Sequence, residues 1–166
     1  MKVRAYVLLV SVGILVMSAS TKKARLSEGN TPGNLAPRIE SMDNGREVRF
    51  QNHSGKYTLL NFWAAYDAES RARNIQLWNE VNKLNSSEIE MISISYDKSP
   101  SVFSETVKAD GLNQENQFRD EQGAESELYK KYDLRKGFKN FLINDEGVII
   151  AANVTPEKLT EILKAI

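Results

Sequence analysis

NFWAAYDAESR, residues 61–71, joins a predicted buried strand directly to a predicted helix. The strand is the apolar run from Tyr57 to Ala64, which only Thr58 and Asn61 interrupt. Such a run is typical of a strand that is covered on both faces. The helix begins at Asp67, a residue type that favours helix N-termini. Because the first N–H groups of a helix lack backbone partners, a junction of this kind is a common position for ligand binding or catalysis.

The composition limits the chemistry that this junction can perform. The chain has 166 residues, 41% of them hydrophobic, and its 22 Lys and Arg balance its 22 Asp and Glu. This length fits one folded domain, and the charge balance gives no support to nucleic-acid binding, which needs a basic surface. The chain contains no cysteine, which excludes thiolate catalysis, disulfide exchange and zinc–thiolate sites. Its one histidine, His53, falls in a predicted turn, so we expect neither a metal site nor a cofactor.

Residues 1–20 have the pattern of a secretory signal peptide. Two basic residues precede an apolar run from Tyr6 to Met17, and Ser18 and Ser20 fit a cleavage site before Thr21. An uncleaved membrane anchor is the main alternative. The same region also resembles a lipoprotein cleavage box in which serine replaces the obligatory cysteine, so that no lipid can be attached there. We therefore expect an exported protein and leave its mode of membrane tethering open.

The remaining residues divide into a predicted flexible tether, residues 21–35, and a folded domain, residues 36–166. The domain opens with a predicted β-hairpin around the Asn44-Gly45 turn. Further strands are expected at 57–64, 89–96, 138–143 and 148–152, and helices from Asp67, from Pro100, over 124–132 and from Pro156. The polar loop 111–122 is compatible with a short strand around Phe118. The first helix is expected to bury Ile75, Trp78, Val81 and Leu84.

This order of elements predicts an α/β fold in which a sheet, partly parallel and partly antiparallel, carries helices on both faces. The strands and helices alternate until the last hairpin, which is followed by a terminal helix. Alternation favours parallel strand pairs, whereas a hairpin joins antiparallel strands. The N-terminal hairpin is expected as an extension of this mixed sheet.

With its motifs in this order, the chain resembles the thioredoxin-like domains of exported bacterial thiol–disulfide oxidoreductases, and more loosely the peroxiredoxins. The matching motifs are Gly33-Asn34-Leu35-Ala36-Pro37, Asn44-Gly45, Gly55-Lys56, Asn61-Phe62-Trp63-Ala64, Tyr96-Asp97, Tyr132, and Phe141-Leu142-Ile143 with Gly147. The resemblance covers about residues 33–165. It implies a three-layer thioredoxin-like sandwich.

The chain departs from this family at two places. Family members carry a Cys-x-x-Cys pair after Trp-Ala and two further residues, and on that pattern Asp67 and Ser70 occupy the cysteine positions. Family members also have a cis-proline before the Phe-Leu-Ile strand, where Phe138 is the best match. Both halves of the redox site are therefore expected to be missing.

Asp67 and Ser70 allow two interpretations. Asp67 is explained completely as a helix N-cap, which accepts hydrogen bonds from free N–H groups and contributes about 1 kcal/mol. The alternative is a repurposed, non-thiol active site that uses the carboxylate and the hydroxyl. We favour the cap, because a serine without a neighbouring histidine base is unreactive and His53 precedes the strand.

The resemblance also implies a surface that holds extended polypeptide beside the helix start. The candidate ligand groove on that surface comprises Trp63, Tyr66, Asp67, Ser70 and Phe138. The favoured hypothesis is a redox-inactive, thioredoxin-like protein of the bacterial cell envelope, exported to the periplasm or to the periplasmic face of a membrane. It would bind an envelope protein or an extended peptide in a chaperone-like manner and would not be an enzyme. A paralogue that retains only the fold, and a chain whose cysteines were removed by engineering, remain alternatives.

Overall fold

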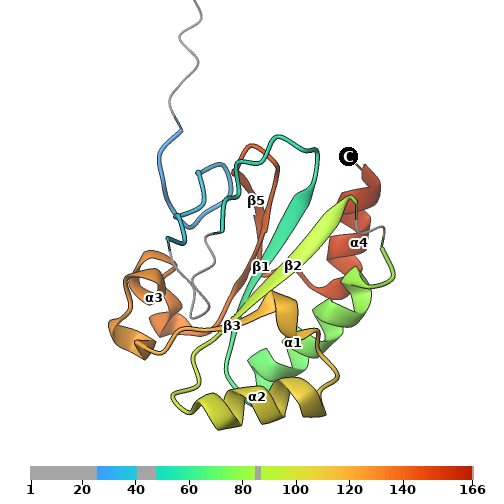
Figure 1. Cartoon of the computed structure of the whole chain (residues 1–166). Coiled ribbons are helices and arrows are strands. Elements are labelled where there is room, and N and C mark those ends of the chain that lie inside the picture. Colours follow the sequence, from blue (N-terminus) through green and yellow to red (C-terminus); the bar gives the residue numbers. More distant parts are fainter. Residues whose placement is uncertain (1–25, 41–47, 85–86, 166) are drawn as a thin grey trace, which may run out of the picture.

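The computed structural model describes residues 26–40, 48–84 and 87–165 (Figure 1). Its strands are β1 (Tyr57–Trp63), β2 (Ile89–Ser95), β3 (Gln117–Arg119), β4 (Asn140–Ile143) and β5 (Ile149–Ala152). Its α-helices are α1 (Ala68–Val81), α2 (Pro100–Ala109), α3 (Glu127–Lys131) and α4 (Pro156–Ala165). Its short 3-10 helices are η1 (Gln114–Asn116), η2 (Gly123–Glu125) and η3 (Leu134–Lys136). The order of these elements agrees with the prediction from the sequence.

The strands form one mixed sheet in the order β3-β2-β1-β4-β5. The central strand β1 pairs in parallel with β2, where Tyr57 lies opposite Ile89 and Trp63 lies opposite Ser95. On its other side β1 pairs with β4 in the antiparallel direction. The β2–β3 pair is parallel and the β4–β5 pair is antiparallel. The predicted combination of parallel and antiparallel strands is confirmed.

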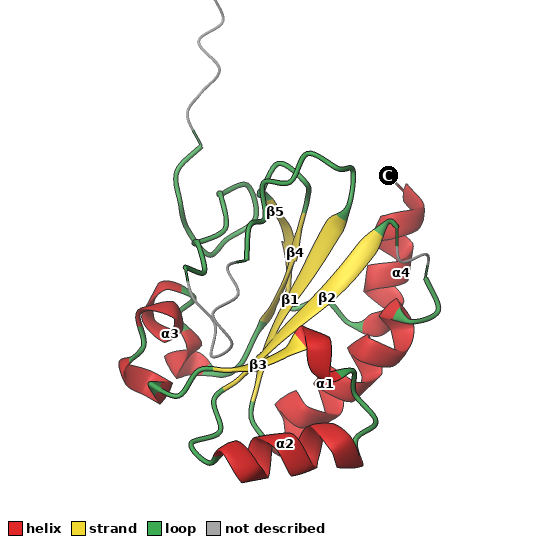
Figure 2. Ribbon diagram, in the orientation of Figure 1, coloured by secondary structure: helices red, strands yellow, loops and turns green. Residues whose placement is uncertain are grey.

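Helices cover both faces of this sheet, as Figure 2 shows. On one face, Leu59 of β1 packs in an apolar cluster with Leu77 of α1 and Leu159 of α4. On the other face, Leu60 and Phe62 of β1 belong to a second cluster, to which residues of α3 add partly buried side chains. Successive β1 side chains therefore enter different cores, which explains why this strand is apolar at nearly every position. The three-layer, thioredoxin-like architecture is confirmed.

The helix α2 lies beyond the end of the sheet where β1 stops (Figure 1). It begins at Pro100, as predicted, and its N-cap is Ser99, whose side chain accepts a hydrogen bond from the Val102 N–H. Trp63, the last residue of β1, packs with Val107 of α2 in a third apolar cluster. The chain segments that follow β1 and β2 are therefore brought together beside α2.

The N-terminal segments lie against the β4–β5 hairpin. The Gly33 N–H donates to the Ile149 carbonyl at 2.8 Å, and the Ile149 N–H donates to the Asn34 carbonyl at 2.9 Å. Folded contacts therefore begin before residue 36, within the segment predicted as a tether. Of the predicted N-terminal hairpin, the structure describes an isolated antiparallel bridge between Ile39 and Val48. The Asn44-Gly45 turn and the predicted signal peptide lie outside the described residues.

Two predictions about helices were wrong in detail. The helix predicted over 124–132 is interrupted at Ser126, whose hydroxyl accepts hydrogen bonds from the N–H groups of Leu128 and Tyr129 and so starts α3 afresh. The face of α1 that is buried also differs from the predicted one, with which it shares only Val81. The buried residues of α1 are Ser70, Asn74, Leu77 and Val81. An apolar pattern could not reveal this face, because half of its residues are polar.

Candidate functional site

The junction between β1 and α1 is closed by hydrogen bonds. Asp67 is the N-cap of α1, and its Oδ1 accepts a hydrogen bond of 2.8 Å from the Ser70 N–H. The predicted cap is thus confirmed. The Ser70 hydroxyl donates to the Asp67 carbonyl at 3.2 Å and accepts from the Ala64 N–H at 3.3 Å. Ser70 is only 1% exposed. At the two positions matched to cysteines, the chain therefore has a hydrogen-bonded helix start.

This arrangement gives the Ser70 hydroxyl no catalytic partner. His53 precedes β1, whereas Ser70 follows it, so the seven-residue strand separates the two side chains. His53 lies in the turn before the strand, where its N–H donates to the Asp145 carbonyl. A serine nucleophile needs a base within hydrogen-bond distance. Among the described residues, the Ser70 hydroxyl is hydrogen-bonded to backbone groups and to no basic side chain.

Phe138 occupies the place that the family resemblance assigns to a cis-proline. No peptide bond is cis in the part of the chain that the structure describes. The Phe138 carbonyl accepts a hydrogen bond of 2.7 Å from Arg73 of α1, so this loop is attached to the helix. The Phe138 ring stacks on Tyr96 with centroids 5.8 Å apart and contacts Tyr66 at 6.3 Å. An aromatic contact therefore links the loop before β4 to the β1–α1 junction.

The five residues of the candidate groove differ greatly in their exposure. Tyr66 is 72% exposed, whereas Asp67 and Phe138 are half-buried. Trp63 and Ser70 are completely covered. Trp63 instead faces α2, where its ring lies 6.4 Å from that of Phe103. A ligand at this surface would touch Tyr66 and its neighbours, and would not reach Trp63 or Ser70.

A hollow of about 660 Å³ opens beside Tyr66. We call it the tyrosine hollow, because Tyr66, Tyr96 and Tyr129 contribute to its wall. Arg71 of α1 also lines it, as do Asp97, Lys98 and Val102 from the segment between β2 and the first turn of α2. Sequence reasoning found Tyr66 but missed the hollow. The available signal was Tyr96-Asp97 at the end of β2, because the carboxyl ends of adjacent parallel strands lie at one edge of a sheet.

Asp97 is the buried acidic group of this site. It lies just beyond the end of β2 and is only 3% exposed. Its two carboxylate oxygens accept hydrogen bonds from the Ala65 N–H at 3.0 and 2.9 Å, and Oδ2 also accepts from the Ser95 hydroxyl at 2.7 Å. The carboxylate thus fastens the loop after β1 to the end of β2. Buried polar groups are normally paired in this way.

The charges around the tyrosine hollow differ in how far they are compensated. Arg71 donates two hydrogen bonds, of 2.8 and 2.6 Å, to the carboxylate of Asp110. Asp97 forms no ion pair with any residue in the described ranges. Burial raises the pKa of the Tyr66 hydroxyl, and the nearby Tyr129, Asp97 and Asp67 raise it further. The Tyr66 phenol therefore stays protonated at neutral pH, in surroundings of negative charge.

A buried polar network holds the first half of α1 to the sheet. The Asn74 Oδ1 accepts hydrogen bonds from Asn61 Nδ2 at 2.9 Å and from the Ser93 hydroxyl at 2.8 Å. The Asn74 Nδ2 donates to Gln117 Oε1 at 3.3 Å. These residues come from α1, β1, β2 and β3, and all are buried. The network fixes the helix whose first turn borders the tyrosine hollow.

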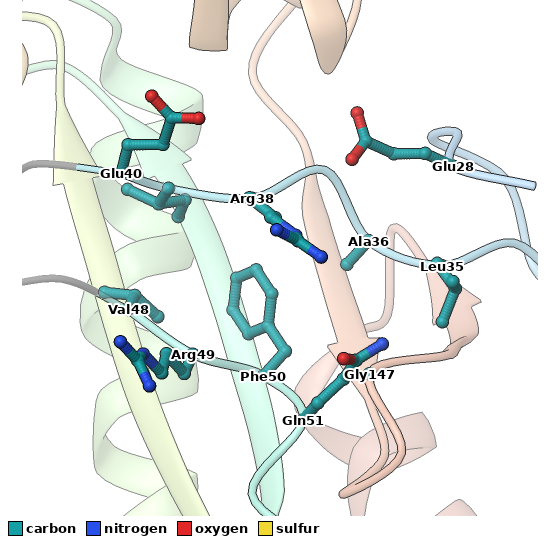
Figure 3. Close-up of a pocket in the computed structure, with 11 residues that line it drawn as sticks. Glu28, Leu35, Ala36, Arg38, Glu40, Val48, Arg49, Phe50, Gln51 and Gly147 are labelled. Atoms are coloured by element: carbon teal, nitrogen blue, oxygen red, sulfur yellow. The ribbon is translucent and has the colours of Figure 1, made fainter.

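A second cleft, of about 640 Å³, lies between the N-terminal segments (Figure 3). The Phe50 ring is directed into the space between the two segments, and Arg38 and Glu28 stand at its margin. Its apolar residues Ile39, Val48 and Phe50 are already buried in the core. This cleft therefore offers a ligand mainly charged groups, and it lies away from the β1–α1 junction.

The described residues contain no cluster of three or more His, Cys, Asp or Glu side chains arranged to hold a metal ion. Within the same ranges, no helix has the length and apolar character needed to cross a membrane.

The fold and the junction together define a thioredoxin-like protein with no thiol at its redox position. The AhpC/TSA family profile matches residues 32–152, and the chain belongs to this family. No curated protein matches the chain in sequence. The resemblance to thioredoxin-like thiol–disulfide oxidoreductases is confirmed, and so is the absence of both cysteines.

Solved structures support this assignment. A thioredoxin-like protein from Parabacteroides distasonis is 68% identical to the chain, with a TM-score of 0.79; the match covers 84% of this chain and 99% of that protein. A thiol-disulfide oxidoreductase from Bacteroides fragilis is 29% identical, with a TM-score of 0.64, over 80% of this chain and 98% of the other. A thiol:disulfide interchange protein from a Bacteroides species shares the fold at 20% identity, with a TM-score of 0.66 over 85% and 90% of the two chains.

Proposed function

We propose that this protein is a redox-inactive, thioredoxin-like module that binds polypeptide without forming a covalent bond. The observation that carries the proposal is the exposed apolar surface at the tyrosine hollow. Within the described residues, the exposed large apolar side chains are Leu26, Tyr66 and Val102, and two of these three border this hollow. Exposed apolar side chains beside a concave surface are typical of binding sites.

The ligand would lie beside the β1–α1 junction, where members of the resembled family carry their reactive cysteines. With no cysteine, the chain cannot form the mixed disulfide that thiol–disulfide exchange requires. The concave surface beside the junction is nevertheless present. An extended polypeptide segment could lie across Tyr66 and Phe138, whose rings are in contact, and direct one side chain into the hollow.

The geometry of the junction disfavours the alternative of a repurposed active site. Asp67 and Ser70 are engaged in capping hydrogen bonds, and Ser70 is buried. A catalytic assignment requires a nucleophile, a base and a stabilising group around one reacting atom. The junction shows a capped helix start instead, and we propose that the protein is not an enzyme.

We propose an envelope location for this binding activity. The support is the sequence of residues 1–20, which has the order of charged, apolar and small residues that is typical of an export signal. The partner would then be an envelope protein or an extended segment of one.

The binding surface can be tested with the chain that begins at Thr21 and an array of immobilised extended peptides. Variants Tyr66→Ala, Val102→Ala and the double variant Tyr66→Ala/Phe138→Ala should bind the array several-fold more weakly than the wild type, because interface aromatic residues often contribute more than about 1 kcal/mol each. Leu26→Ala is the matched control, since Leu26 is also an exposed apolar residue but lies in the N-terminal segment. Circular dichroism verifies that each variant is folded.

Equal binding by the wild type and the double variant would exclude this surface. Loss of binding in Leu26→Ala to the same degree would show that the assay reports exposed apolar area in general.

A further inference from the structure

The charges and ring faces of the tyrosine hollow define what it can hold. We infer that the tyrosine hollow binds the guanidinium group of an arginine side chain presented by the bound polypeptide. This inference rests on the proposed polypeptide-binding function and adds the chemistry of one specificity-determining side chain.

Three tyrosine rings line the hollow. Tyr66, Tyr96 and Tyr129 come from three separate segments and contribute to one wall. Tyr96 and Tyr129 meet edge to face, with ring centroids 5.2 Å apart and an interplanar angle of 78°. Tyr66 is largely exposed, so its ring remains accessible to a ligand. Aromatic ring faces attract cations, and the planar guanidinium group stacks on them especially well.

The hollow also has a buried carboxylate in its wall. Asp97 lies in the wall with neutral hydrogen-bond donors and, in the described ranges, with no ion pair. A buried charge acts over a longer distance than an exposed one, because little water screens it. The half-buried Asp67 adds negative charge at the start of α1. The hollow therefore presents to a ligand the negative charge of Asp97 and Asp67, which Arg71 offsets only in part because its guanidinium is paired with Asp110.

The cations at the hollow do not cancel this charge. Arg71 is held by two hydrogen bonds to Asp110, so most of its charge is balanced by that carboxylate and only part of it acts on Asp97. Lys98 is exposed at the margin, where solvent screens its ammonium group. Burial contributes most to the raised pKa of the Tyr66 hydroxyl, and the contributions of Asp97 and Asp67, which follow that of Tyr129, agree with this balance. A ligand cation would thus find a net attraction inside the hollow.

The size and the apolar margin of the hollow fit arginine rather than a small cation. A volume of about 660 Å³ accommodates a long side chain with part of its backbone. Val102 and Ala65 supply apolar surface at the edge, where the methylene groups of an arginine could pack while its charged end lies deeper. Long basic side chains commonly bury their stems in this way.

The experiment compares peptides that differ in one charge. The probes are acetyl-Ala-Ala-Xaa-Ala-Ala-amide peptides in which Xaa is arginine, its uncharged isostere citrulline, or norleucine, and affinity for the chain that begins at Thr21 is measured by titration calorimetry. We expect the arginine peptide to bind about ten-fold more tightly than the citrulline peptide at physiological salt. Asp97→Asn, which keeps an acceptor oxygen for the Ala65 N–H, should reduce this preference to less than about two-fold.

A charge reversal at the margin gives a second test that does not depend on a buried residue. Lys98→Glu should strengthen binding of the arginine peptide about three-fold and leave the citrulline peptide unchanged. Lys108→Glu is the matched control, because Lys108 is also exposed but lies in the last turn of α2 and not in the wall of the hollow. It should change neither affinity.

The outcomes separate this inference from the proposed function. Equal affinities for the arginine and citrulline peptides, or tighter binding of norleucine, would overturn the inference; if Tyr66→Ala still weakened all three, polypeptide binding at this surface would stand. If no peptide bound, either in the calorimetric titration or on the array, both the arginine inference and the proposed polypeptide-binding function would be refuted.

Discussion

Replacing Asn74 by alanine should destabilise the protein strongly, although this position looks like an ordinary polar helix residue in the sequence. Asn74 is 0% exposed and makes hydrogen bonds to Asn61, Ser93 and Gln117. The substitution removes the acceptor for Asn61 Nδ2 and Ser93 Oγ and the donor to Gln117 Oε1. All three groups would stay buried without these partners.

The size of the effect follows from those orphaned groups. Each buried polar group that loses its partner costs roughly 1–3 kcal/mol. The three share one side chain and can rearrange together, so their costs do not add fully, and we expect a total of about 3 kcal/mol. With a urea m-value of about 2 kcal/mol/M, the unfolding midpoint would fall by about 1.5 M.

Urea unfolding followed by far-ultraviolet circular dichroism measures this shift. Asn79→Ala is the matched control, because Asn79 is an exposed asparagine of the same helix, and it should change stability by less than about 0.5 kcal/mol. Adding Ser93→Ala removes one orphaned hydroxyl, so it should cost less in the Asn74→Ala background than in the wild type. A loss below about 1 kcal/mol in Asn74→Ala, or strict additivity with Ser93→Ala, would refute the proposed role of the network.

Three further predictions concern chemistry, pH and export. In an insulin-reduction assay the wild type should show no thiol–disulfide turnover, and Asp67→Cys/Ser70→Cys should restore little, because Phe138 stands at the position matched to the family's proline; measurable wild-type turnover would contradict the assignment. Hydrogen bonds from Thr160 and Lys83 lower the pKa of Glu80, so its stabilising contribution should be complete above pH 4.5 and be lost as the pH falls through the lowered pKa. The stability of Glu80→Gln should therefore fall less than that of the wild type on acidification. An equal loss of stability in both proteins would argue against this role. Mass spectrometry of the exported protein should find Thr21 at its N-terminus; an intact residue 1 would indicate an anchor.

The helix cap at the junction was predictable because capping is a local property. Asp67 follows a buried strand and precedes a helical pattern, and its side chain reaches a group only three residues away. The Ser99–Pro100 start of α2 could be predicted for the same reason. Sequence spacing carries enough information when the interacting groups are neighbours in the chain.

The tyrosine hollow could not be predicted from spacing. Tyr66, Asp97 and Tyr129 are separated by about thirty residues each along the chain and meet only because β1 and β2 end at the same edge of the sheet and α3 folds back beside them. The Ala65 N–H and the Ser95 hydroxyl are recognisable as the partners of Asp97 only in the folded structure.

Buried polar residues were the second source of error. The search for an apolar face on α1 selected Ile75, Trp78 and Leu84, which are only partly buried, and passed over Asn74. A polar side chain inside the core is recognisable only when its hydrogen-bond partners on other strands are known. The mixed sheet and its covering helices, by contrast, followed from strand and helix patterns that are long and regular.

The most direct test of the central claim, that polypeptide binds beside the capped β1–α1 junction, is to map the binding surface by nuclear magnetic resonance. The chain that begins at Thr21, labelled with nitrogen-15, would be titrated with the tightest-binding peptide of the array. We predict that the amide signals of Ala65, Tyr66, Asp97 and Val102 shift most. Shifts concentrated instead around Arg38 and Phe50, at the cleft of Figure 3, would contradict the account, as would the absence of any shift at saturating peptide.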